Sequence, residues 1–270
     1  MKTVLLHVRE DSGQESRLQA ALDVVRCFDG HLVCLQATPF DSYIVGDPFG
    51  GVYAFPEVIE RVRETERAER TRMEADLGNE GVSWEWLHFD GSAGQMLVEQ
   101  GRLADLIVVS QPSSRRGTSE PLPIAADVAL YGRAPVLVVP QRSNRLDCSG
   151  TALVAWNGSA EAANALRLAV PMLKSAGAVH ILTVDAADGT DLPSTAACRY
   201  LSRHGIATEL HETTRRNNSA SEAIAGIAQG LGASYIVMGA YGRSRLSELV
   251  LGGTTRALLH HTDIPILMAH

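Results

Sequence analysis

Short apolar runs alternate with helical patterns along the second half of the chain. The runs are nearly continuous in Val, Ile and Leu, and they predict strands at residues 151–156, 178–184, 206–211, 234–239 and 264–269. Helical patterns, such as the apolar face marked by Ala162, Leu166 and Ala169, predict helices near residues 161–175, 193–204, 220–231 and 254–261. Strands without polar alternation are buried on both faces, as in a parallel sheet covered by helices. The pattern therefore predicts a doubly wound α/β domain.

The first half repeats this plan. Residues 3–8 correspond to 151–156, residues 104–109 reappear 129 positions later, and residues 134–139 reappear 130 positions later. Three matches in the same order indicate a tandem repeat. We expect two domains, residues 1–142 and 149–270, joined by the polar and aperiodic segment 141–150. The predicted fold class is α/β, with two tandem doubly wound five-stranded parallel sheets flanked by helices.

One insertion distinguishes the first half. Residues 38–56 lie between a strand predicted at 32–37 and a helix predicted at 57–77, and they include the aromatic residues Phe40, Tyr43, Phe49, Tyr53 and Phe55. Aromatic side chains in such a segment pack against the protein more often than they form a lid. We therefore interpret the insertion as a packing segment.

The last strand of each half is expected at a sheet edge. Residues 134–140 and 264–270 are apolar and lack the charges that usually protect such an edge. We expect these strands to face each other within one chain and to build an intramolecular pseudo-twofold dimer. Further association of chains into a homodimer is compatible with the sequence.

Composition narrows the class of protein. The net charge of −7 argues against a nucleic-acid partner and against an anionic membrane surface. No apolar run approaches the ~20 residues of a membrane helix, and the run at residues 4–6 is too short for a signal-peptide core. The four cysteines are scattered, which suits reduced thiols and disfavours a disulfide framework or a structural zinc site. We expect a cytoplasmic protein.

A glycine constellation follows the fourth strand of the second half. Gly239, Gly242 and Gly252 have the spacing G-x2-G-x9-G, and Gly253 and Thr254 follow where a helix is predicted to begin. Glycines after a strand let the backbone approach a ligand, and free amides at a helix start bind anions. The hydroxyls of Thr254 and Thr255 can cap the helix or bond a phosphate oxygen.

This arrangement resembles the universal stress proteins of the ATP-binding type, an adenine nucleotide alpha hydrolase-like fold. The resemblance covers the chain as a tandem pair and is strongest from residue 151 to residue 270. It implies that Gly239 and Gly242 lie against the ribose and phosphates, and that Gly252, Gly253 and Thr254 carry the phosphate turn. It also implies ATP as the ligand, with ADP and AMP as alternatives, together with magnesium.

The resemblance assigns further residues and exposes two departures. Val184, which ends the second strand, would offer backbone groups to the adenine edge. Asn157 stands where the family has an acidic residue, and its amide accepts a hydrogen bond more weakly than a carboxylate. Gly253 stands where Ser or Thr is expected, so that the hydroxyl arrives one residue later, at Thr254. Arg243 either reaches the phosphates or lies in a solvated loop.

The first half departs from the motif altogether. Ser110 and Ser113 stand in the places of Gly239 and Gly242, and Leu122 or Pro123 in the place of Gly252. Side chains and a missing amide obstruct a phosphate path there. We expect one nucleotide per chain, bound in the second half.

Three functions remain open at this stage. The leading hypothesis is a non-enzymatic nucleotide-binding regulator or sensor in the stress response, which acts on an unknown protein partner. The second is a slow ATPase or phosphotransfer enzyme, for which Asp185, Asp188 and Glu248 are nearby acidic residues without motif support. The third is a sensor of another small ligand. No catalytic residue or metal site is predicted, and the adjacent His260 and His261 are expected to face solvent because neighbouring helical residues point apart.

Overall fold

The computed structural model describes residues 1–39, 44–46, 52–54, 56–112, 124–143, 145–185, 192–214, 219–240 and 253–270. The first half consists of β1 (Thr3–Val8), α1 (Gln14–Phe28), β2 (His31–Thr38), β3 (Ile44–Gly46), β4 (Val52–Ala54), α2 (Pro56–Leu77), β5 (Ser83–Asp90), α3 (Ala93–Gln100), a 3-10 turn (Gly101–Leu103), β6 (Leu106–Ser110), α4 (Ile124–Tyr131) and β7 (Val136–Val139). Within the insertion, β3 and β4 form an antiparallel pair. The side chains of its five aromatic residues lie outside the described part, so the expected packing role stays a prediction.

The second half follows the predicted order of elements. It consists of β8 (Thr151–Ala155), α5 (Ala160–Ser175), β9 (Ala178–Val184), α6 (Ser194–Arg203), β10 (Glu209–Thr213), α7 (Ala220–Gly230), β11 (Ala233–Gly239), α8 (Gly253–His261) and β12 (Ile266–Ala269). Among the residues described in both halves, no helix is both long enough and apolar enough to cross a membrane.

One predicted strand begins too early. The sequence pattern predicts a strand at 206–211, starting from Ile206, whereas β10 begins at Glu209. Gly205 adopts a φ of 77°, and the amide of Ile206 donates to the carbonyl of Leu201 at 3.1 Å. This is the hydrogen bond of a helix C-terminal Schellman turn, in which an apolar residue follows the left-handed glycine. Ile206 is therefore buried as part of the end of α6 rather than as a strand residue.

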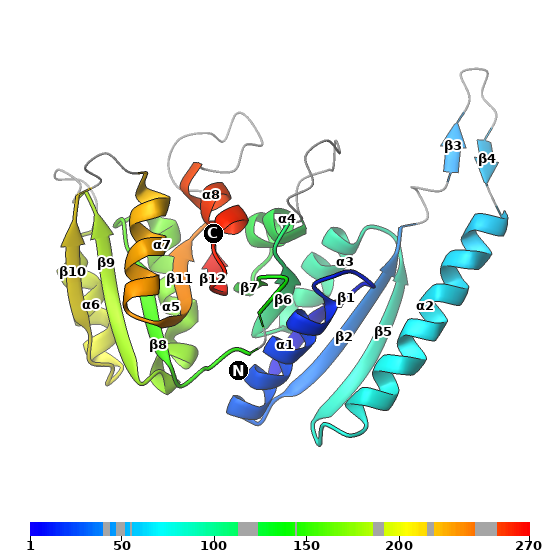
Figure 1. Ribbon diagram of the computed structural model, residues 1–270, viewed down its shortest axis with the longest axis horizontal. Coiled ribbons are helices and arrows are strands. Elements are labelled where there is room, and N and C mark those ends of the chain that lie inside the picture. The colour runs from blue at the N-terminus through cyan, green and yellow to red at the C-terminus, as the bar shows by residue number, and fades with distance from the viewer. Residues whose placement is uncertain are drawn as a thin grey trace.

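The five-stranded parallel sheets of the two halves join edge to edge into one ten-stranded sheet. Its ten strands run in the order β10-β9-β8-β11-β12-β7-β6-β1-β2-β5, and each half has its own strands in the order 3-2-1-4-5. All neighbouring strands are parallel except β12 and β7, which pair antiparallel at the centre, for example Ile266 with Val138. This pairing of the last strands is the one predicted from their uncharged edges. Figure 1 shows the halves diverging on either side of it.

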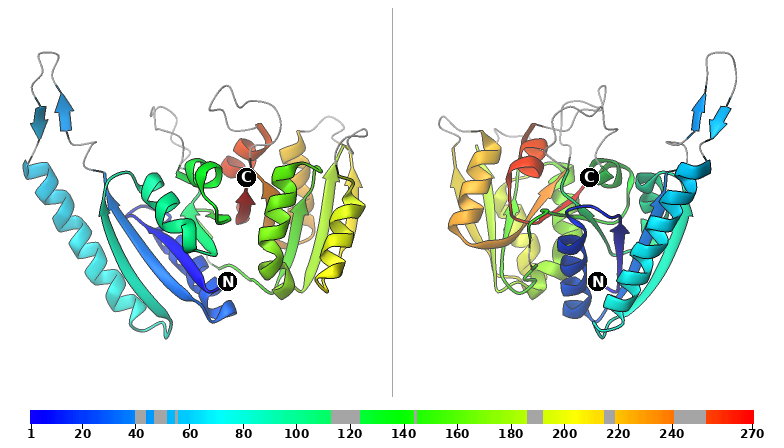
Figure 2. Two further views of the ribbon diagram at one scale, coloured as in Figure 1. Left: turned by 180° about the vertical axis from the view of Figure 1, so that it is seen from behind. Right: turned by 45° about the vertical axis from the view of Figure 1, so that its right-hand side comes forward.

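Helices cover both faces of the sheet and enclose two apolar cores. Residues of α1, α2, α5 and α6 pack on one face, and residues of α3, α4, α7 and α8 pack on the other. Figure 2 shows these layers from two further directions. The inner strands, such as β1 and β11, are therefore buried on both sides, which is the reason for their continuous apolar residues, whereas the end strands β5 and β10 are more exposed and more polar.

The connection between the halves is more than a polar linker. Leu146 and Cys148 are buried in the same core as α1 and α5. The amide of Leu146 donates to Asp23 Oδ2 at 2.9 Å, and Ser16 Oγ donates to the carbonyl of Gln141 at 2.8 Å. The connection is thus anchored on α1 by contacts that its local sequence does not reveal.

Candidate functional site

The candidate site lies where the strand order of the second half reverses. In the order 3-2-1-4-5, the reversal falls between β8 and β11, which are adjacent and parallel. Ligands of doubly wound sheets bind outside the carboxyl ends of the strands at this point. Figure 1 places α8 at the same edge as the carboxyl ends of β8, β9 and β11. The fold therefore gathers Asn157, Gly239 and the start of α8 at one edge.

A tight turn connects β8 to α5. Asn157 Oδ1 accepts a hydrogen bond from the amide of Ser159 at 3.1 Å, and Ser159 Oγ accepts one from the amide of Ala162 at 3.2 Å. Gly158 adopts a φ of 76°, a left-handed conformation that favours glycine. Because Asn157 Oδ1 serves the turn, its Nδ2 is the group that this exposed side chain offers to a ligand.

Gly239 has a packing reason to be glycine. A Cβ at this position would lie 2.5 Å from the amide nitrogen of Ala162 and 2.7 Å from the carbonyl carbon of Glu161. The start of α5 therefore passes directly over the end of β11. This contact explains Gly239 without a ligand, and it brings the β8–α5 turn against the strand end.

The start of α8 has the form of an anion site. Gly253 is exposed at the first position of this nine-residue helix, and a Cβ there would meet no atom of the described residues within 4 Å. Amides in a first helical turn lack partners within the helix and carry the positive end of its dipole. Thr254 is half-buried beside Gly253, whereas Thr255 is buried and turned away from solvent. Gly242, Arg243 and Gly252 lie outside the described residues.

Val184 ends β9 on the far side of β8 from β11. It is half-buried and pairs with Thr213 of β10, and the following amide of Asp185 donates to the Thr213 carbonyl at 2.8 Å. Asp185 has a φ of 51°, so the chain turns sharply at this point. Val184 thus lies at the same carboxyl-end edge of the sheet as Gly239, two strands away from it.

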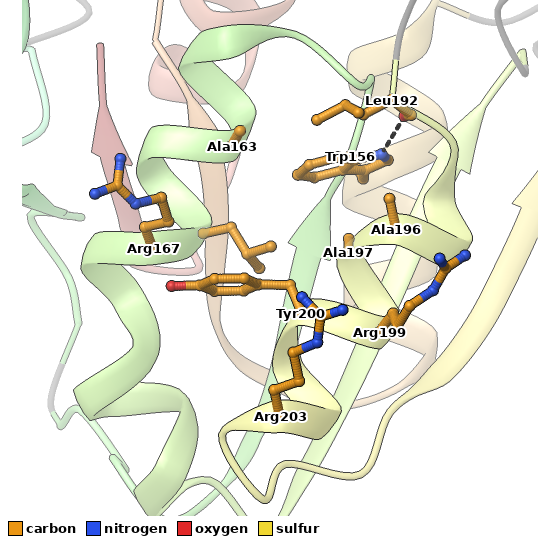
Figure 3. Close-up of a pocket in the computed structure, with 10 residues that line it drawn as sticks. Trp156, Ala163, Arg167, Leu192, Ala196, Ala197, Arg199, Tyr200 and Arg203 are labelled. Carbon is orange, nitrogen blue, oxygen red and sulfur yellow. Dashed lines mark hydrogen bonds between the residues drawn. The ribbon is translucent and has the colours of Figure 1, made fainter.

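A cavity of about 320 Å³ opens between α5 and α6 (Figure 3). The rings of Trp156 and Tyr200 line it, together with the side chains of Arg167, Arg199 and Arg203. Trp156 Nε1 donates to the carbonyl of Leu192 at 2.9 Å. None of the predicted site residues that the structure describes lines this cavity, and Trp156 is the neighbour of Asn157.

The equivalent point of the first half is filled by Arg17. This side chain is completely buried, and its guanidinium lies between the end of β1 and the end of β6. Nε donates to the carbonyl of His7 at 2.8 Å, Nη2 to the carbonyl of Arg9 at 2.9 Å, and Nη1 to Asp11 Oδ1 at 3.0 Å. Nη1 also donates to Ser110 Oγ. Burial lowers the pKa of Arg17, and the neighbouring Asp11 opposes that shift.

Acidic residues of α2 lie near the carboxyl ends of the first-half strands. Glu69 Oε2 accepts a hydrogen bond from Gln36 Nε2 at 3.1 Å, and Glu66 Oε2 accepts one from Thr38 Oγ1 at 2.6 Å. Burial raises the pKa of Glu69, while its hydrogen bond from Gln36 acts in the opposite direction. The first-half strand ends are thus occupied by the protein's own charged groups.

Sequence reasoning found the serine at position 110 but missed Arg17, its partner. The available signal was a charged residue beside Leu18 in the first turn of a helix whose buried positions are apolar from Leu18 onward. That signal does not identify the partner, since Ser110 lies 93 residues away along the chain.

Fold and site together define a class: a doubly wound α/β protein of two halves, in which Arg17 occupies the strand-order reversal of the first half. Residues 150–270 match the profile of the Universal stress protein family. The whole chain is similar in fold to a universal stress protein from Archaeoglobus fulgidus, with a TM-score of 0.75, 17% identity, and coverage of 99% of this chain and 95% of that one. It is also similar to a functionally unknown protein from Pseudomonas aeruginosa, with a TM-score of 0.62, 17% identity, and coverage of 99% and 92%. No curated protein matches it in sequence.

The second half is therefore a universal stress protein domain. The first half shares its strand order, and the solved structures extend the likeness of fold over both halves. At these identities the likeness to solved structures establishes the fold, and function has to be argued from the site.

Proposed function

We propose that the second half binds one adenine nucleotide, ATP or alternatively ADP or AMP, and that the protein acts as a cytoplasmic stress-response regulator rather than an enzyme. The observation that carries the proposal is the contrast between the two strand-order reversals. In the second half, a Cβ at Gly253, the start of α8, would meet none of the described residues within 4 Å. In the first half, the guanidinium of Arg17 fills the corresponding region, and α4 begins with the β-branched Ile124.

The nucleotide would span the strand ends. Its phosphates would accept hydrogen bonds from the amides of Gly253 and Thr254, and Asn157 Nδ2 would donate to the nucleoside. Val184 would border the base. Gly242, Arg243 and Gly252 complete the motif in sequence, and their contribution rests on the motif alone.

Magnesium would reach this site with the phosphates. Among the described residues, a group of three metal-ligating side chains occurs only at His180, Glu209 and His211, on strands β9 and β10. Mg²⁺ commonly keeps several waters and binds through phosphates with few protein ligands. The residues at the strand edge are thus compatible with a magnesium nucleotide.

Calorimetric titration with ATP and magnesium tests the proposal. We expect a ratio near one per chain. Gly253→Val adds a side chain at a position where a Cβ meets no described residue within 4 Å, so it should preserve the fold and obstruct the phosphates. Loss of two charge-assisted hydrogen bonds, at about 1.5–3 kcal/mol each, weakens binding by about a hundredfold or more.

The matched control is Gly226→Val on α7, where a Cβ also meets nothing within 4 Å. It should bind ATP as the wild type does. A ratio near two, or unchanged binding by Gly253→Val, would show that the site is misplaced. Sustained phosphate release above that of Gly253→Val would favour the ATPase, and mass spectrometry of the freshly purified protein would reveal a different small ligand.

A further inference from the structure

Three metal-ligating side chains meet on the sheet away from the candidate nucleotide site. His180 of β9 and Glu209 of β10 are register partners, and His211 lies two residues further along the same face of β10. His180 Nδ1 lies 2.9 Å from His211 Nε2. Glu209 Oε2 lies 3.5 Å from His180 Nδ1, and Glu209 Oε1 lies 3.8 Å from His211 Nε2.

We propose that these three residues form a Zn²⁺ site. Zinc binds imidazole nitrogen at about 2.0–2.1 Å and carboxylate oxygen at about 2.0–2.2 Å, so tetrahedral ligand atoms stand roughly 3.3–3.5 Å apart. The two nitrogens lie 2.9 Å apart, each has an oxygen of Glu209 at 3.5 or 3.8 Å, and one ligand atom from each residue lies within 4.8 Å of the others. Small rotations of the two imidazole rings widen the distance between their nitrogens, and the torsions of the exposed Glu209 side chain bring one carboxylate oxygen to the ion.

The donor set selects the kind of metal. Two imidazoles with one carboxylate suit zinc, whereas Ca²⁺ and Mg²⁺ prefer oxygen ligands. The His180 side chain is 12% exposed and that of His211 is 28% exposed, so water competes little for the two nitrogens. Three protein ligands leave a fourth position for water or another small ligand.

The first half shows that the fold does not require this pair of histidines. Its corresponding register partners are Val33 and Glu85, and the position two residues beyond Glu85 is Leu87. Only the carboxylate is kept there, and an apolar pair replaces the two imidazoles. A hydrogen bond between His180 and His211 can stabilise the sheet edge, but the same edge of the first half forms with an apolar pair at these positions.

The location separates this site from the nucleotide. Glu209 is the first residue of β10, and His180 lies in the first half of β9, so the site lies toward the amino ends of the strands. The nucleotide is proposed at the carboxyl ends. β10 is also an end strand of the sheet, which leaves the cluster accessible (Figure 1).

The test uses the tag-free full chain, stripped of metal with a chelator and titrated with zinc sulfate. We expect one saturable Zn²⁺ per chain and a rise in Tm with zinc, because the ion binds the folded state. Loss of one imidazole in His180→Ala or His211→Ala should weaken binding by about a hundredfold or more. Glu209→Gln should weaken it less, since the amide oxygen remains a poorer ligand. Co²⁺ should give the visible absorption bands of a tetrahedral complex, which zinc removes.

His204→Ala is the matched control, because His204 is a half-buried histidine at the end of α6 whose ring lies against Tyr200. It should bind zinc as the wild type does. Circular dichroism establishes that each variant is folded, and His211→Gln replaces His180→Ala if the more buried position proves intolerant. Absence of saturable binding by the wild type overturns the proposal. Undiminished binding by a folded His211 variant also overturns it, as does loss of binding in His260→Ala instead.

Discussion

Arg17 offers the sharpest test of how the first half is built. Arg17→Ala removes a guanidinium that is completely buried and donates to the carbonyls of His7 and Arg9 and to Asp11. The substitution leaves these acceptors in a region that water does not easily reach. Breaking a buried ion pair from one side costs about 3–5 kcal/mol. Asp11 is 34% exposed and recovers some hydration, which places the expected loss toward the lower end of that range.

Urea unfolding followed by tryptophan fluorescence measures this loss. The chain has three tryptophans, and in a Trp156→Phe background Trp84 and Trp86 of β5 report on the first half. The midpoint for Arg17→Ala should fall clearly. Arg17→Lys keeps the charge but not the planar set of donors, so its urea midpoint should lie between those of the wild type and Arg17→Ala.

A surface ion pair provides the control. Arg67 Nη2 lies 2.8 Å from Glu60 Oε1, and both side chains are more than half exposed. Exposed pairs contribute about 0.2–1 kcal/mol, so Arg67→Ala should shift the midpoint only slightly. If Arg17→Ala were no more damaging than Arg67→Ala, the interpretation of Arg17 as a structural replacement for a ligand would be refuted.

Two further predictions concern stability. Burial lowers the pKa of His7 to about 3, with Arg17 and Arg9 contributing, whereas in the unfolded chain it is about 6.5. Below pH 6.5 His7 is therefore protonated in the unfolded chain but stays neutral in the folded chain, and the free energy of unfolding should fall by about 1.4 kcal/mol per pH unit toward pH 3. The urea midpoint of His7→Leu should depend less on pH than that of the wild type. Equal pH dependence of the two proteins would contradict this prediction. Gly239→Ala should lower Tm, at a cost of about 1–3 kcal/mol, because its Cβ meets the backbone of Ala162 at 2.5 Å. Gly226→Ala, at an open position of α7, should instead be neutral or stabilising. Equal changes in Tm for the two variants would contradict the packing role of Gly239.

The sequence by itself determined the order of elements and the tandem repeat. Continuous apolar runs report burial on both faces, and this property depends on each strand's own residues rather than on its distant partners. The uncharged last strands likewise indicated that they pair with each other, as Ile266 and Val138 do. The glycine spacing located a candidate ligand edge because strand ends and helix starts are local features, such as Gly253 at the first position of α8.

Only the tertiary structure decided which groups occupy those edges. It joined the expected two sheets into one, anchored Leu146 on α1, and showed that Gly239 is required by the backbone of α5. Arg17 meets Ser110 across 93 residues, and His180 meets His211 across 31 residues from separate strands. No spacing rule encodes such meetings, because they depend on strand order and register, which the whole chain sets together. The fold can therefore be predicted from local sequence patterns, whereas the chemistry of the sites depends on the folded arrangement.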